Sequence, residues 1–65
     1  MSNYSILLYW SKDDNCWFAE HPALPGCVAD GANPMDALVN LNISRMLWIA
    51  VSKEAGLEIP PEDLR

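Results

Sequence analysis

The sequence predicts an α+β fold in which one long helix packs on a three-stranded antiparallel sheet, in the order β-β-β-α. Three observations predict it: alternating apolar residues in the first half, a proline- and glycine-containing segment in the middle, and a capped apolar helix pattern afterwards. The 65 residues are expected to form a single domain, 1–65. A chain of this length buries only about 60% of its unfolded surface, so self-association would add needed stability.

The first half of the chain predicts a hairpin. Tyr4–Trp10 is rich in aromatic and branched residues, and its even-numbered side chains make one dominant apolar face. Residues 11–15 have the composition of a turn, because Asp and Asn side chains bond nearby backbone groups and tolerate left-handed geometry. Cys16–Glu20 is therefore expected to return antiparallel to the first strand.

A segment with two prolines should end the hairpin. Pro22 and Pro25 each remove a backbone donor, so a continuous strand cannot pass through them. Gly26 permits the positive φ that a tight turn after Pro25 would need. Cys27–Ala29 is expected to form a short third strand beside the first two.

The second half predicts a helix from about Pro34 to Ala55. Asn33 is a good N-cap residue, Pro34 suits the first helical position, and Gly56 suits the stop. At 100° per residue, four large apolar side chains form a stripe expected to face the sheet: Leu38, Leu41, Trp48 and Ile49.

A second apolar stripe on this helix predicts self-association, at least to a dimer. It lies away from the first stripe and consists of Ile43, Leu47, Ala50 and Val51. Since a helix that is apolar nearly all round is normally buried all round, another copy is the expected cover. The alternative is that the tail covers the stripe through Leu57, Ile59 and Leu64. For the tail itself, the sequence leaves open a short edge strand through Leu57 and Ile59 or a position tucked under the helix.

The charge argues for a protein partner over nucleic acid. Nine acidic and four scattered basic residues give a net charge of −5, whereas phosphate binding needs clustered Lys and Arg. An acidic surface suits a basic partner, although such a charge can also serve solubility alone. The candidate partner-binding residues are Asp13, Asp14, Glu20 and Asp30.

The sequence predicts no metal, no cofactor and no catalytic residue. Cys16, His21 and Cys27 are too few for a zinc site, which usually has four ligands in close-set pairs. Either cysteine with His21 could be a nucleophile and base on paper, but their spacing does not support it. The three glycines match no phosphate-binding loop.

A cytoplasmic protein with reduced thiols is expected. The longest apolar run, Met46–Val51, is far short of the roughly 20 residues of a membrane span, and no secretory signal opens the chain. Two cysteines are also too few for a disulfide framework.

One segment carries a resemblance to a known family. The run His21-Pro22-Ala23-Leu24-Pro25-Gly26-Cys27, in register with Gly31 and with Ala37-Leu38 in the helix start, resembles the N-terminal domain of the HicB antitoxin family in a short stand-alone form. Asn33 stands where that family usually has Thr, and Asp36 where it has Glu; both keep the capping chemistry.

The resemblance implies a β-β-β-α unit similar to a truncated ribonuclease-H-like fold. It also implies an antitoxin that binds and masks a HicA-like toxin, a small basic RNA-cleaving protein. The DNA-binding domain of longer family members is not implied for this chain. The alternative is an orphan self-associating domain of the same type, with no toxin partner and an unknown ligand.

Overall fold

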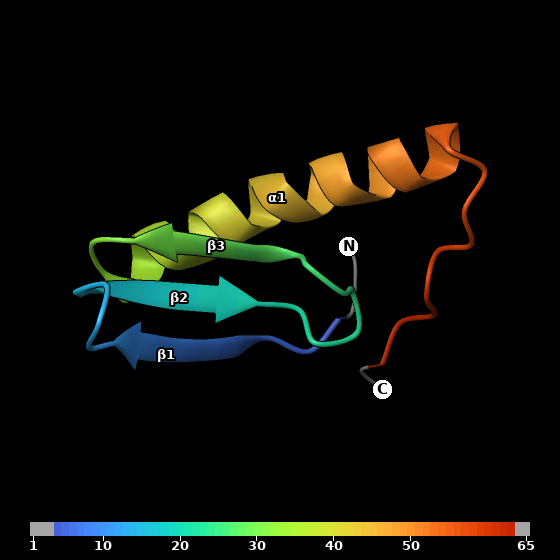
Figure 1. Ribbon diagram of the computed structural model, residues 1–65. Coiled ribbons are helices and arrows are strands. Elements are labelled where there is room, and N and C mark those ends of the chain that lie inside the picture. The colour runs from blue at the N-terminus through green and yellow to red at the C-terminus, as the bar shows by residue number, and fades with distance from the viewer. Residues whose placement is uncertain (1–3, 64–65) are drawn as a thin grey trace.

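The computed structural model, which describes residues 4–63, confirms the α+β fold (Figure 1). The elements, in chain order, are β1 (Leu7–Ser11), β2 (Cys16–Glu20), β3 (Val28–Gly31) and α1 (Pro34–Glu54). The strands form one antiparallel sheet in the order β1-β2-β3. Helix α1 packs mainly against β3 and β2, which leaves β1 as an edge strand with little cover.

β1 begins later than the alternation predicts. The backbone groups of Ser5 have other partners, because its N–H donates to Asp63 Oδ1 (2.7 Å) and its carbonyl lies 3.0 Å from His21 Nδ1. Tyr4 is buried, and its hydroxyl group bonds the backbone of Pro60. The strand therefore starts at Leu7 and extends one residue beyond the expected end, to Ser11.

The turns form as their residues predict. Asn15 has φ 53° and ends the β1–β2 turn, and Gly26 has φ 81°. In the loop after β2, His21 N–H donates to Cys27 O (3.1 Å), and Cys27 N–H donates to Leu24 O (2.9 Å). These bonds make Cys27 the last residue of the loop. The third strand is therefore Val28–Gly31 and not Cys27–Ala29.

Helix α1 has the predicted cap and nearly the predicted length. Asn33 Oδ1 accepts from the N–H of Asp36 (2.9 Å), Pro34 is the first helical residue, and Gly56 follows the end with φ 72°. Of the stripe expected to face the sheet, Leu41 is fully buried and the other three residues are partly buried. The buried apolar core consists of Tyr4, Ala19, Leu24, Cys27, Ala37 and Leu41.

Ala37 belongs to the core because α1 starts very close to β3. A side chain on Gly31 would collide with the backbone of Asp36 and Ala37, so the glycine allows the first turn of α1 to rest on the strand end. The contact between the backbones of β3 and α1 thus fixes where the helix starts on the sheet. The apolar stripe alone does not predict this position.

The tail returns to Tyr4 and Ser5, and the second apolar stripe of the helix stays exposed although Ile59 is partly buried. Tyr4 Oη donates to Pro60 O (2.6 Å), and Ser5 Oγ donates to Asp63 Oδ2 (2.5 Å). We call these four residues the terminal clamp. Residues 57–63 form no strand, so the alternative of a short edge strand through Leu57 and Ile59 is wrong. Leu57 is 64% exposed, and Leu64 lies outside the described residues.

Acid should release the terminal clamp. The hydrogen bonds from the Ser5 side chain and backbone lower the pKa of Asp63. A carboxyl whose folded-state pKa is depressed stabilises the fold above its unfolded pKa, and that contribution is lost as the pH falls through the folded value. The amide signal of Ser5 in NMR spectra should therefore shift only as the pH falls below the ordinary titration range of an aspartate. Asp63→Asn should abolish this titration, whereas Asp13→Asn should leave it unchanged; a Ser5 signal insensitive to acid would contradict the clamp.

Candidate protein-binding surface

The strand register separates the sheet into a covered and an uncovered face. Leu8, Ala19 and Ala29 are cross-strand partners and share a face, and the complete burial of Ala19 places that face under α1. Alternate residues point the other way, to a side that α1 does not cover (Figure 1). We call this side the outer face; its residues are Leu7, Tyr9, Ser11, Cys16, Phe18, Glu20, Val28 and Asp30.

Two stacked aromatic rings occupy the middle of the outer face. Tyr9 and Phe18 are opposite each other on β1 and β2, with ring centroids 5.9 Å apart and an interplanar angle of 23°. Leu7 and Val28 flank them and are both exposed. Aromatic and aliphatic side chains that stay accessible in this way are typical of protein interfaces.

Carboxylates surround the aromatic pair. Tyr9 Oη donates to Glu20 Oε2 (3.4 Å), and desolvation together with the Glu20 charge raises the pKa of Tyr9. Asp30 lies opposite Phe18 on β3. Desolvation and the charges of Asp30 and Asp14 raise the pKa of Cys16, which favours the protonated thiol over the thiolate.

The outer face includes two of the four predicted partner-binding residues, Glu20 and Asp30. A third, Asp14, lies in the adjoining turn, where its Oδ2 accepts a hydrogen bond from Ser11 Oγ (3.1 Å). Asp13 is exposed in the β1–β2 turn and makes no hydrogen bond or ion pair within residues 4–63. Sequence reasoning missed Tyr9 and Phe18 as site residues; their odd and even positions share a face only through the register of the hairpin.

The second helix stripe is also uncovered. Ile43, Leu47 and Val51 are 53–63% exposed, and Ala50 is exposed beside them. A shallow hollow of about 360 Å³ adjoins the stripe and is lined by Ser44, Leu47, Trp48, Val51 and Ser52. Trp48 is fixed at its edge, because its Nε1 donates to Pro25 O (2.9 Å).

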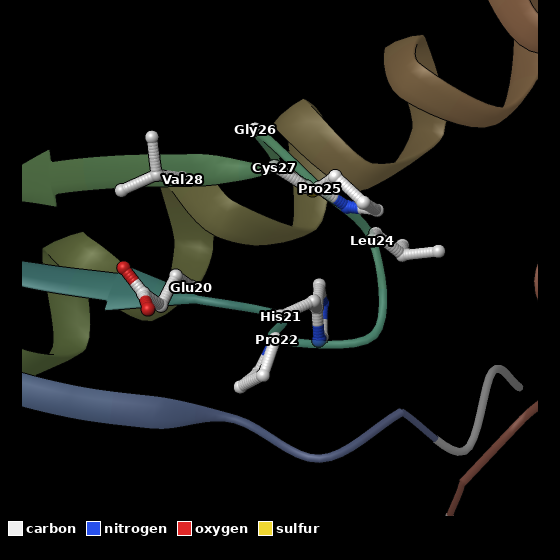
Figure 2. A pocket seen from close by; sticks show the side chains of 8 residues that line it. All are labelled: Glu20, His21, Pro22, Leu24, Pro25, Gly26, Cys27 and Val28. Atoms are coloured by element: carbon white, nitrogen blue, oxygen red, sulfur yellow. The ribbon is translucent and has the colours of Figure 1, made fainter.

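The loop between β2 and β3 encloses a small pocket of about 190 Å³ (Figure 2). His21 at its base is buried, with Nδ1 directed to Ser5 O and with no partner for Nε2 in the described part of the chain. Cys27 Sγ lies 3.9 Å from Ser44 Oγ. Within residues 4–63, no group of three or more His, Cys, Asp or Glu side chains could hold a metal ion.

Comparisons with known proteins add no relative. No family model, no curated protein and no solved structure matches the chain. No helix among the described residues has the length and apolar character to span a membrane.

Proposed function

We propose that this chain is a cytoplasmic protein-binding module of the antitoxin type, which binds and masks a basic, HicA-like RNA-cleaving toxin. The observation that carries the proposal is the outer face, where Glu20 and Asp30 border the Tyr9–Phe18 pair and Asp14 lies in the adjoining turn, bonded to Ser11. The resemblance of the His21–Cys27 segment to the HicB family supports it. In this role the chain acts by binding, without a catalytic residue, metal or cofactor.

The chemistry of the outer face fits arginine-rich surfaces. A guanidinium group can stack on an aromatic ring while its N–H groups donate to carboxylates, and the outer face presents both features within one patch. Acidic groups around the patch would also attract a basic protein and raise the association rate. Because an RNA-cleaving protein binds its substrate through basic residues, covering those residues would block access of RNA.

Binding of a purified HicA-like toxin tests this function. We expect the association rate to fall about tenfold or more between low and physiological salt, as for electrostatically steered complexes. Glu20→Gln combined with Asp30→Asn should slow association, and Phe18→Ala should speed dissociation. Glu54→Gln, at the far end of α1, is the matched control and should change neither rate. Absence of binding, or rates that salt and these variants leave unchanged, would refute the proposal.

An orphan self-associating domain is the second candidate function. The exposed helix stripe of Ile43, Leu47, Ala50 and Val51 favours it, because contiguous apolar patches usually mark interaction sites. If this stripe holds two copies together, the wild type should be a dimer and Leu47→Lys a monomer. Sedimentation of both proteins at high micromolar concentration tests this.

A further inference from the structure

The two edges of the sheet differ in how their backbone groups are satisfied. On β3, side chains of α1 cap the outward carbonyls: Asn40 Nδ2 donates to Asp30 O (2.8 Å), and Ser44 Oγ donates to Val28 O (3.4 Å). The helix thereby occupies this edge, so no further strand can pair there without displacing both side chains.

The alternation of an antiparallel ladder shows which groups β1 turns outward. The backbone N–H and C=O groups of Val28 and Asp30 point away from β2, as their carbonyl bonds to α1 show. Their cross-strand partners Glu20 and Phe18 must therefore direct their own backbone groups to β1. Leu7 and Tyr9, opposite Glu20 and Phe18, therefore bond to β2. It follows that the N–H and C=O groups of Leu8 and Trp10 point to the free edge.

Nothing in the described structure covers the edge of β1. No hydrogen bond between described residues reaches the outward groups of Leu8 or Trp10. The strand Leu7–Ser11 also contains no proline and no charged residue, the two features with which proteins usually protect an edge. The side chains from Ile6 to Trp10 remain 36–50% exposed.

We propose that β1 pairs with β1 of a second copy of this chain, antiparallel across a two-fold axis, to form a six-stranded sheet. With the axis at Tyr9, Leu8 of each copy lies opposite Trp10 of the other. These two residues then exchange both N–H···O bonds, so four hydrogen bonds satisfy all the outward groups of both strands. The inference does not depend on the proposed function, because it uses the edge of β1 and needs no other protein.

A second copy fits this edge in charge and in size. Two chains of net charge −5 repel each other, and the strand Leu7–Ser11 contains no charged residue, so the paired strands themselves add no carboxylate to the interface. Residues 6–10 expose on the order of 450 Å² per chain, so pairing of two copies buries at most about 900 Å², the size of a weak and concentration-dependent dimer. Pairing would also make the two outer faces continuous.

A pair of variants at Leu8 isolates the backbone contribution. Leu8→Ala and Leu8→Pro both remove the leucine side chain, but only proline removes the outward N–H, which has no partner within one chain. In sedimentation at high micromolar concentration, we expect the wild type and Leu8→Ala to be dimers and Leu8→Pro to be a folded monomer. The loss of one N–H per copy should weaken association about tenfold or more.

Amide hydrogen exchange of the wild type decides the question even if Leu8→Pro fails to fold. The amides of Leu8 and Trp10 should be protected at high concentration and exchange rapidly on dilution, whereas Tyr9, bonded to β2, stays protected at both. Rapid exchange of Leu8 and Trp10 at high concentration would overturn the proposal, as would a monomeric wild type. Leu47→Lys should leave the β1 dimer intact; dissociation by Leu47→Lys but not by Leu8→Pro would place the interface on the helix stripe instead.

Discussion

Replacing Gly31 by alanine is expected to remove a large part of the free energy of unfolding of this domain. The added Cβ would lie 2.7 Å from Asp36 C and 2.8 Å from Asp36 Cβ, and closer still to Ala37 N. Two of these atoms belong to the backbone of the first helical turn, which cannot rotate away as a side-chain tip could. Overpacking typically costs about 1–3 kcal/mol, and a domain of this size holds only about 3–5 kcal/mol.

Thermal unfolding followed by circular dichroism checks this expectation. Gly26→Ala is the matched control, because no atom lies within 4 Å of its added Cβ, although its φ of +81° strains any L side chain. That strain costs about 1–2 kcal/mol, so this variant should stay folded with a lowered melting temperature. A Gly31→Ala protein that melts with the wild type would mean that α1 does not rest on the end of β3.

Leu24→Ala in the wild-type chain is expected to remove most of the stability of the fold, although Leu24 lies in a loop. Its side chain is fully buried, as are those of Leu41 and Cys27 in the same core cluster. Truncating a buried leucine costs about 2–5 kcal/mol, through lost apolar contact and the cavity that remains. The midpoint of urea unfolding should therefore fall sharply. At the upper end of this range, the variant would be unfolded even without urea.

Val39→Ala serves as the control for this second substitution. Val39 is 53% exposed on α1, and alanine has the higher helix propensity, so its urea midpoint should stay near that of the wild type. If Leu24→Ala cost less than about 1 kcal/mol, the loop would be a surface feature and not part of the core.

The sequence predicts those parts of the fold that arise from local interactions. The turn at residues 11–15, the N-cap at Asn33 and the stop at Gly56 each depend on neighbouring residues, and all are confirmed. The position of α1 across the sheet depends on the contact of Gly31 with Asp36 and Ala37, which joins two elements. Apolar periodicity shows that one face of a helix packs, but not which strands it packs on.

The same limit applies to the strand face and to the candidate site. Alternation in Tyr4–Trp10 predicts a packed face, yet of its members only Tyr4 is buried, because α1 leaves β1 largely uncovered. The acidic residues could be chosen from charge alone. Their arrangement around Tyr9 and Phe18 required the register of the hairpin, which depends on the turn geometry and cannot be read from residue types.

The terminal clamp has a consequence for the order in which the fold assembles. Tyr4 and Pro60 are 56 positions apart, so their hydrogen bond closes nearly the whole chain into a loop, whereas the hairpin closes one of a few residues. The entropic cost of closure grows with loop length, so hairpin and helix can form while the clamp is still open. During synthesis, Tyr4 must therefore wait until Pro60 has left the ribosome. Only then can Tyr4 acquire its final neighbours.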